Sequence, residues 1–423
     1  MQIADPVKFL RDLFDAAVAA ADPRTTLAPH LPRSPAGKTL LLGAGKAAAS
    51  MAATVEDCWT GGLAGVAVTR YGHAALCAKI EVIEAGHPLP DEVGQSAAKR
   101  FLDLATDLTE SDLLLFLISG GASALLVEPM PGLTLGEKRE INDTLLKSGA
   151  PIGEINCLRK HLSAIKGGRL AAAAFPARVV TLAISDVPGD DPSVIGSGPT
   201  VGDTTSCIDA LSVAHNYGIK LPDKAQNALR SGLWETVSPT AKVLKNTSFT
   251  TVATSTNSLN AAADVARSFG IQVMRMGDNI EGEASVLGQS HADTAIQSGP
   301  GILISGGEAT VTIRNQNGRG GPNCEYLLSL ALALRGNPRV YALACDTDGI
   351  DGTEDAAGAV ITPDTIKRAE LQGLNASQML QNNNSYEFFK VLGDLIHTGP
   401  TLTNVNDFRA ILISSGDTGP TVL

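Results

Sequence analysis

The sequence lacks paired cysteines, long apolar runs and an excess of positive charge. Its six cysteines stand singly along 423 residues without a C-x-x-C pair, which argues against a disulfide framework or a zinc site and favours reduced thiols in a cytosolic protein. No run approaches the ~20 apolar residues that span a bilayer. Charged residues interrupt the start of the chain, so we expect an amphipathic helix there rather than a signal peptide, and a cytoplasmic address.

Positive charge is scarce overall. Lys and Arg total 33 against 44 Asp and Glu, and the formal net charge is −11. A sequence-independent grip on nucleic acid or on an anionic membrane needs a basic face, so we expect neither partner. A few local cations and backbone N–H groups suffice to bind a phosphate compound, and that ligand class stays open.

Apolar residues make up 44% of the chain, enough to bury sizeable cores. Short runs rich in Leu, Ile and Val alternate with Ala-rich helical patterns, and each run ends at Gly, Ser or Asp. The clearest runs are 39–42, 66–69, 113–118 and 179–184. This alternation predicts an α/β protein with a mainly parallel, Rossmann-like sheet, whose ligands bind at the carboxyl ends of the strands.

The pattern changes around residues 220–250, where the chain becomes mostly polar. Strand-like runs then restart at 249–253, 272–275, 301–304, 310–313 and 340–344. We therefore expect two domains, 1–245 and a smaller α/β domain 246–423, with the active site in the cleft between them.

The first Gly-rich turn, Gly43-Ala44-Gly45-Lys46-Ala47-Ala48, matches the dinucleotide pattern G-x-G-x-x-A. Arg70 ends the next predicted strand, where an Arg suits NADP, so a nicotinamide-dependent reductase is one interpretation. A plain tight turn is another. Lys46 is a cation at a helix start, where the helix dipole disfavours it, and this indicates an anionic ligand nearby.

Two Ser-Gly-Gly segments follow predicted strands in different domains. Small residues at a strand end leave free N–H groups for an anion, although a turn with a Ser cap explains them equally well. The candidate phosphate-binding residues here are Ser119, Gly120, Gly121, Ser123, Ser305, Gly306, Gly307 and Glu308.

A basic segment at 159–170 carries Arg159, Ser163 and Lys166 at helical spacing, so we expect them on one helix face. Two adjacent glycines, Gly167 and Gly168, are costly inside a helix and indicate close approach by another group. The alternative is a solvated basic face. In so acidic a chain, we favour an anion site.

Carboxylates follow two further strand-like runs. Asp186 comes directly after 179–184, and Asp190 could be a turn residue. Asp348 and Asp351 follow 340–344; an EF-hand is excluded because the loop follows a strand. Such a set suits Mg²⁺ or a substrate hydroxyl. The Gly-rich segment 314–325 adds Arg319, Asn323 and Glu325, either as a phosphate-contacting loop or as a surface turn.

The ordered set GAGKAA, AGHPLPDE, SGGASALL, RKHLSAIKGGRLA, SDVPGDDPSVIGSGPT, SGGEATVTI and TDGIDGTEDAAGA resembles the type-2 glycerate kinases, which carry a MOFRL C-terminal domain and bear the older label hydroxypyruvate reductase. The resemblance covers almost the whole chain. It implies a two-domain α/β enzyme that uses ATP and Mg²⁺ to phosphorylate the 2-hydroxyl of D-glycerate, giving 2-phosphoglycerate.

On this resemblance the family lysine falls on Lys46, and Pro322 stands where the motif GRGGRNQE has its second Arg. Either Arg319 supplies that charge, which we expect, or another cation does. From its place after a buried strand, and not from the resemblance, Asp186 is expected to accept the hydroxyl proton. The other expected substrate or phosphate contacts are the two Ser-Gly-Gly sets with Arg159, Lys166, Asn323 and Glu325, and the expected Mg²⁺ ligands are Asp190, Asp348 and Asp351. A homodimer is possible.

Two rivals stay open. The first is an NAD(P)H-dependent hydroxypyruvate reductase, but this interpretation gives no role to the second Ser-Gly-Gly segment or to TDGIDG. The second is a non-catalytic sensor of a sugar phosphate or nucleotide, but this interpretation gives no role to the carboxylates at the strand ends.

Overall fold

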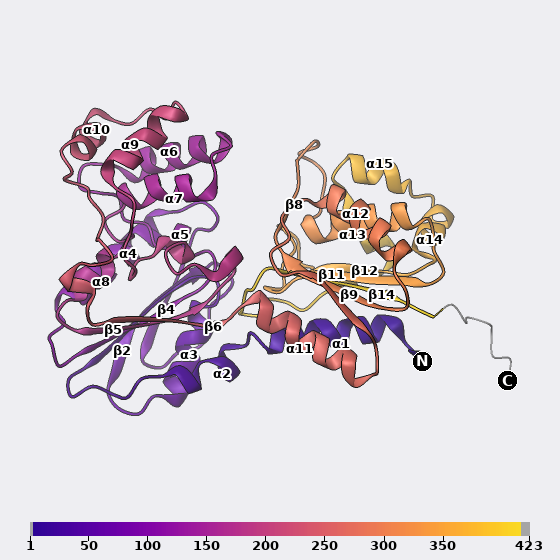
Figure 1. Ribbon diagram of the computed structural model, residues 1–423, viewed down its shortest axis with the longest axis horizontal. Coiled ribbons are helices and arrows are strands. Elements are labelled where there is room, and N and C mark those ends of the chain that lie inside the picture. Colours follow the sequence, from indigo (N-terminus) through magenta and orange to yellow (C-terminus); the bar gives the residue numbers. More distant parts are fainter. Residues whose placement is uncertain (1–2, 416–423) are drawn as a thin grey trace. The chain divides into compact units, whose positions relative to one another are not determined.

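The computed structural model describes residues 3–415 and divides the chain into two compact units (Figure 1). The N-terminal unit is Pro23–Val252, and the C-terminal unit combines the chain up to Asp22 with the chain from Ala253 onward. This division differs from the expected boundary near 245. The first helix packs with the C-terminal unit, and the run at 249–253 ends the N-terminal sheet instead of starting a new one.

The N-terminal sheet has six strands in the order β3-β2-β1-β4-β5-β6. Their bounds are β1 Thr39–Ala44, β2 Leu63–Arg70, β3 Ile80–Ala85, β4 Leu113–Ile118, β5 Arg178–Ile184 and β6 Thr247–Ala253. The pairs β1–β2, β2–β3, β1–β4 and β4–β5 are all parallel. Every residue of β1 and β4 is buried, because helices cover both faces of a parallel sheet.

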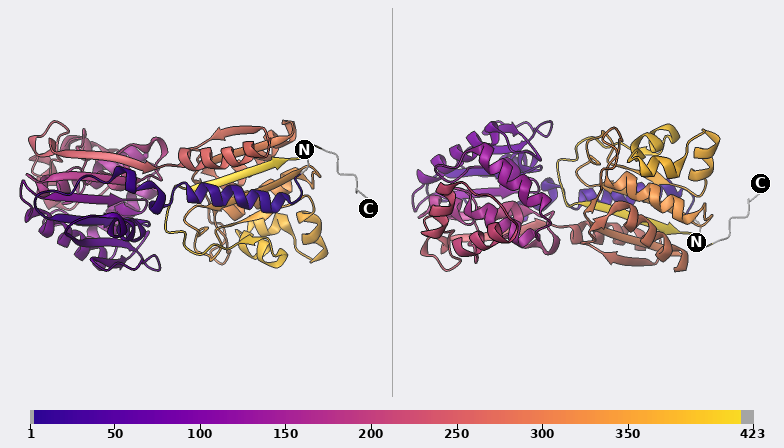
Figure 2. Two further views of the ribbon diagram at one scale, coloured as in Figure 1. Left: turned by 90° about the horizontal axis from the view of Figure 1, so that it is seen from below. Right: turned by 90° about the horizontal axis from the view of Figure 1, so that it is seen from above.

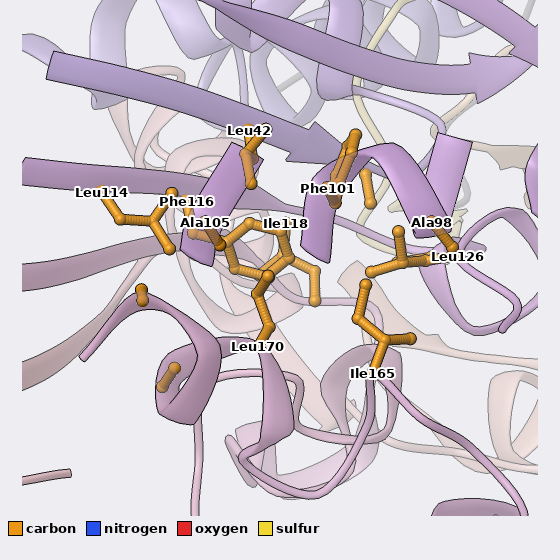
Figure 3. Close-up of a cluster of buried hydrophobic side chains, with 14 of the residues drawn as sticks. Leu42, Ala98, Phe101, Ala105, Leu114, Phe116, Ile118, Leu126, Ile165 and Leu170 are labelled. Atoms are coloured by element: carbon orange, nitrogen blue, oxygen red, sulfur yellow. The ribbon is translucent and has the colours of Figure 1, made fainter. Parts of the chain in front are cut away.

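The helices around this sheet are α2 Pro23–Thr26, α3 Ala48–Cys58, α4 Glu92–Thr106, α5 Ala122–Leu125 and α8 Arg169–Ala174. Phe116 and Ile118 of β4 belong to one apolar cluster with Phe101 of α4 and Leu170 of α8 (Figure 3). A second helical group shares its own apolar cluster: α6 Leu135–Lys147, α7 Ile152–His161, α9 Cys207–Asn216 and α10 Asp223–Arg230. Thr134 and Ser206 begin α6 and α9 with capping boxes.

The C-terminal sheet is mixed, in the order β13-β12-β11-β14-β9-β7. Its strands are β7 Val273–Gly277, β9 Gly301–Gly307, β11 Val340–Asp346, β12 Gly358–Ile361, β13 Leu395–Ile396 and β14 Asp407–Ile413, beside a small pair of β8 Gly282–Glu283 and β10 Ala309–Thr310. β14 runs antiparallel to both β11 and β9. The expected strand at 310–313 shrinks to β10.

Helices cover both faces of the C-terminal sheet (Figure 1). On one face lie α12 Ala284–Gln297, α13 Pro322–Leu334, α14 Thr365–Leu371, α15 Ala376–Gln381 and α16 Ser385–Leu392. On the other lie α1 Pro6–Ala19 and α11 Ser255–Ser268, with α1 beside β14 in Figure 2. Phe9, Leu10, Leu13 and Phe14 of α1 are all buried there. Among residues 3–415 no helix is long and apolar enough to cross a membrane.

Because α1 covers the C-terminal sheet, we expect Phe14→Ala to destabilise that unit by about 3–5 kcal/mol, the cost of emptying a buried aromatic site. Urea denaturation measures the loss, and hydrogen exchange locates it in β9 and β14. The control is Leu371→Ala, which truncates a side chain that is 80% exposed and should change stability by less than about 0.5 kcal/mol. Lost protection in β1 and β4 instead would contradict this assignment of α1.

Candidate active site

The carboxyl edge of the N-terminal sheet gathers three of the predicted segments. Ala44 of β1 pairs with Ile118 of β4, and Ile118 pairs with Ala183 of β5. Since these strands are parallel and in register, the turns that follow them lie along one edge. Lys46, the turn at 119–121 and Asp186 are therefore brought to the same edge, with Asp186 half-buried two residues after the end of β5.

Ser119 joins the turn after β4 to the turn after β1. The N–H of Ala47 donates to Ser119 Oγ at 3.0 Å, and the N–H of Lys46 donates to the Gly120 carbonyl at 2.8 Å. Gly45 has φ +129°, and a Cβ there would lie 2.2 Å from Ser119 Oγ, so only glycine allows this approach. Ser119 is fully buried. Its hydroxyl holds the two turns together, which differs from the expected contact with a phosphate.

A pocket of about 270 Å³ opens beside these turns, lined in part by His87, Gly121, Ser123, Lys138, Arg159 and Lys166. A Cβ on Gly121 would lie 3.0 Å from the His87 ring and 3.3 Å from Lys46 Cγ. The stem of Lys46 therefore runs past Gly121 next to the pocket. Four of the sequence-predicted residues share this pocket: Gly121, Ser123, Arg159 and Lys166.

Three cations of the pocket, Lys138, Arg159 and Lys166, are not paired with a carboxylate, whereas Arg139 and Asp143 of the same lining pair with Glu92 and Lys147. Lys166 Nζ donates to the Ser123 carbonyl at 3.0 Å, and Lys138 Nζ donates to the Leu162 carbonyl at 2.7 Å. Both lysines are buried, and the buried Nε of Arg159 has no hydrogen-bond partner. Within residues 3–415 none of the three forms an ion pair. Buried charges are normally paired, so this arrangement is suited to an anionic ligand.

The electrostatics of the pocket lower the proton affinity of both lysines. Burial, and then the charge of Arg159, lowers the pKa of Lys166 to about 7. Burial, with the charge of Lys166 next in size, lowers the pKa of Lys138 well below its usual value. A bound anion would favour the charged forms of both groups and raise both pKa values.

The helix predicted through 159–170 is wrong in its extent. α7 ends at His161, and Ser163 and Lys166 lie in irregular structure after it. Gly167 and Gly168 have φ values of +58° and +82°, which end the helical path and allow the chain to turn into α8. Arg159 and Lys166 nevertheless meet at the pocket, while Ser163 Oγ donates to the Glu128 carbonyl at 3.2 Å.

Sequence reasoning missed His87 and Lys138. Lys138 lies on the apolar face of α6, among the buried residues Leu135, Ile141 and Leu145. A lysine among apolar residues at helical spacing is the signal that could have identified Lys138, because burying a charged side chain costs free energy and is rare without a functional or structural reason. His87 lies in the motif AGHPLPDE, which indicates the family but does not by itself indicate a pocket.

The second Ser-Gly-Gly segment is not a loop. Ser305, Gly306 and Gly307 lie within β9 and pair with β14 in antiparallel register, since the strand continues to Gly307. The Gly306 carbonyl accepts from Nη1 of the buried Arg409 at 3.2 Å. Only Glu308, directly after the strand, is exposed. The expected phosphate-cradling turn before a helix is therefore absent at 305–308.

Asp351 caps α13. Its Oδ1 accepts the N–H of Asn323 and its Oδ2 the N–H of Cys324, both at 2.9 Å. Burial raises the pKa of Asp351 to about 6 despite these bonds. Asn323 Nδ2 donates to Asp407 Oδ1 at 2.6 Å, and Glu325 accepts from Asn383 Nδ2 at 3.0 Å. All of these side chains are buried and stabilise the C-terminal unit.

Arg319 and Pro322 lie at the start of α13. Arg319 forms ion pairs with Glu354 and Glu387, and its guanidinium lies 4.6 Å from the centre of the Tyr386 ring. Pro322 is the first residue of the helix, a position where the missing N–H costs nothing. Its presence thus has a local structural reason.

The expected magnesium ligands belong to different units. Asp190 ends a short 3₁₀ turn in the N-terminal unit, and Asp348 is buried in the C-terminal unit, where its Oδ1 accepts the N–H of Ile350 at 2.9 Å. The assignment of Asp190, Asp348 and Asp351 to Mg²⁺ stays a prediction. Within residues 3–415, the side chains His161, Cys207 and Glu235 form a cluster of three potential metal ligands.

Comparison with known proteins gives the family. A model described as a domain of unknown function, DUF4147, matches residues 9–230, and the MOFRL family model matches residues 301–407. The protein thus combines a Rossmann-like DUF4147 domain with a MOFRL domain. The chain belongs to the type-2 glycerate kinase family, as its motifs predicted.

Three relatives illustrate the similarity. A protein of Agrobacterium vitis with the provisional name hydroxypyruvate reductase is 49% identical over 96% of this chain and 94% of its own. A glycerate 2-kinase of Pyrococcus horikoshii is 40% identical over 90% of this chain and 88% of its own. The crystal structure of glycerate kinase from Thermotoga maritima matches with a TM-score of 0.86 at 37% identity, covering 96% of this chain and 99% of that one.

The lowered pKa of Lys166 predicts a pH-dependent stability. Between pH values of about 7 and 10.5 the unfolded lysine holds its proton while the folded one has lost it. The unfolded state binds more protons, so this group makes stability rise by about 1.4 kcal/mol per pH unit in that window. We expect Lys166→Met to remove this contribution to the slope of stability against pH in urea denaturation, while Lys138 keeps its own contribution of the same sign. Lys99→Met, at an exposed position of α4, is the control and should retain it. Equal slopes in wild type and Lys166→Met would show that Lys166 keeps its proton.

Proposed function

We propose that the protein is a glycerate 2-kinase, which transfers the γ-phosphoryl group of ATP to the 2-hydroxyl of D-glycerate. The observation that carries this is the cluster of unpaired cations at the carboxyl edge of the N-terminal sheet, formed by the buried Lys138 and Lys166 and the half-buried Arg159. A small anionic substrate supplies the missing negative charge. The proposed reaction is that given by the names of the relatives, which are glycerate 2-kinase and glycerate kinase.

Each predicted residue at this edge has a chemical role in the proposal. The three cations bind the carboxylate of glycerate. Asp186 accepts the proton of the 2-hydroxyl as its oxygen attacks the γ-phosphorus, and the bond from that phosphorus to the bridging oxygen of ADP breaks. Lys46, which runs past Gly121, stabilises charge on the transferring group. Mg²⁺ enters with the ATP phosphates in this proposal, and Asp190, Asp348 and Asp351 stay its predicted protein ligands.

The hydrogen bonds of the first Gly-rich turn argue against a reductase. A dinucleotide pyrophosphate binds to free N–H groups in such a turn. Here the N–H groups of Lys46 and Ala47 already donate to Gly120 and Ser119. The turn is therefore used for packing against its neighbour, and the nicotinamide interpretation loses its main support.

The first test is ADP release with D-glycerate, followed by identification of the product as the 2- or 3-phosphate. We expect Lys46→Ala to fold normally and to lower kcat by about 10²–10³, the usual cost of one preorganised charge contact. Lys99→Ala, on the exposed face of α4, is the matched control and should retain wild-type turnover. A near-normal kcat in Lys46→Ala would remove Lys46 from the mechanism. Consumption of NADPH with hydroxypyruvate, but no ADP release, would replace the kinase by the reductase.

A second test concerns Arg319. Because both sides of its guanidinium already contact carboxylates, we infer that Arg319 holds the segment before α13. Arg319→Lys should then leave the KM values for ATP and D-glycerate unchanged. A raised KM for either substrate would instead support the contact expected from the sequence. In that case Arg319 would leave Glu354 and Glu387 and bind a phosphate or carboxylate of the substrate.

A further inference from the structure

Away from the pocket, three side chains of different chemistry converge in the helical group of the N-terminal unit. His161 is the last residue of α7, Cys207 is the first residue of α9, and Glu235 follows α10. One imidazole nitrogen, the thiol sulfur and one carboxylate oxygen all lie within 4.8 Å of one another. The imidazole and the thiol are buried, while Glu235 is exposed to solvent.

The tautomer of His161 follows from its surroundings. Its Nδ1 lies 2.9 Å from the Cys157 carbonyl, which only accepts hydrogen bonds, so Nδ1 carries a hydrogen. In the neutral ring Nε2 then bears a lone pair. That lone pair is 3.4 Å from Glu235 Oε1, which is also an acceptor. Two acceptors face each other here unless a proton or a metal ion lies between them.

The spacing of these acceptors suits a tetrahedral ion. With Zn–N and Zn–O bonds of about 2.0–2.2 Å, a tetrahedral angle places the two ligand atoms about 3.3–3.5 Å apart. The Nε2 to Oε1 distance of 3.4 Å lies in that range. The Cys207 N–H lies 3.2 Å from both oxygens of Glu235 and fixes the carboxylate beside the thiol. The bond from Nδ1 to a backbone carbonyl is also the usual support of a metal-binding histidine.

We propose that His161, Cys207 and Glu235 form a binding site for a transition-metal ion of the zinc class, with water in the fourth position. Nitrogen, sulfur and oxygen donors together favour Zn²⁺ over Mg²⁺, which prefers oxygen alone. The site is therefore separate from any Mg²⁺ that accompanies ATP. The sequence argued against zinc because its cysteines are unpaired, but one thiolate suffices when the fold supplies the other ligands.

Charges of both signs surround the cluster. Arg169 is a cation near Cys207 and Glu235, and it donates to the carbonyls of Trp234 and Glu235 at 2.7 and 3.0 Å. Asp203 pairs with Lys160, and Asp209 supplies negative charge near His161. A bound ion would link α7, α9 and the segment after α10, and so stabilise the helical group independently of the proposed kinase reaction.

The test uses the full chain after removal of metals by a chelator. Isothermal titration with Zn²⁺ should show one ion per chain, with about one proton released as the Cys207 thiol becomes a thiolate. Co²⁺ should give the near-ultraviolet absorption band of a cobalt thiolate, and Mg²⁺ should not compete. Glu235→Gln and Cys207→Ser should each weaken Zn²⁺ binding by at least about 100-fold, since even outer-shell changes cost up to that amount.

The control is Cys58→Ser, which removes the exposed thiol that would bind zinc adventitiously. It should leave the affinity and the cobalt band unchanged. The proposal is overturned if the wild-type chain binds no stoichiometric Zn²⁺, if Cys58→Ser abolishes binding, or if Glu235→Gln binds as tightly as wild type. Because Glu235 is exposed, that variant remains informative even if Cys207→Ser fails to fold.

Discussion

The packing of the turn after β1 against the turn after β4 fixes the geometry of the candidate active site. Two hydrogen bonds hold the turns, from Ala47 to Ser119 and from Lys46 to Gly120, and Gly45 makes the approach possible. As a result the backbone of Lys46 cannot shift independently of the chain that leads to Gly121 and Ser123. A cation and the wall of an anion pocket are thereby positioned by backbone contacts rather than by flexible side chains.

The pocket is rich in positive charge, although the chain as a whole is negatively charged. A chain with net charge −11 keeps the buried Lys138 and Lys166 beside the half-buried Arg159, all three without carboxylate partners. Mutual repulsion and desolvation oppose folding here, and the apolar core of the sheet and its helices must offset them. A site that is strained in this way when empty gains most from a small anion that neutralises it. The same reasoning explains why a larger neutral ligand would not relieve the strain.

The sequence predicted the N-terminal sheet well because its central strands are buried on both faces and therefore appear as unbroken apolar runs, such as Leu113–Ile118. β3 was missed because its half-exposed residues include two glutamates. The mixed C-terminal sheet was only partly predicted, since β14 pairs antiparallel with β9 about a hundred positions earlier in the chain. The fold class was nevertheless confirmed, and so was the family.

The site was harder to predict than the fold. Residue type identified Lys46, Arg159 and Lys166 as neighbours of a ligand, but only the structure shows that Ser119 is used in packing and that Asn323 and Asp351 belong to a buried network. A side-chain hydroxyl or carboxylate can bind a ligand or accept a hydrogen bond from a backbone N–H equally well. Its partner is decided by contacts between distant segments, such as that of Asp407 with Asn323, and a local sequence pattern does not reveal such contacts.

The placement of α1 has a consequence for biosynthesis. Since α1 covers the C-terminal sheet, the whole N-terminal unit is an insertion within the C-terminal one. The ribosome makes α1 before the N-terminal unit, whereas the partner strands β9, β11 and β14 are made after that unit. The inserted unit can complete its own core while the apolar face of α1 is still exposed to water, so the nascent chain carries an unpartnered amphipathic helix during this period. Chaperones that recognise such helices would be expected to bind the growing chain at α1, and to release it only when β14 has emerged.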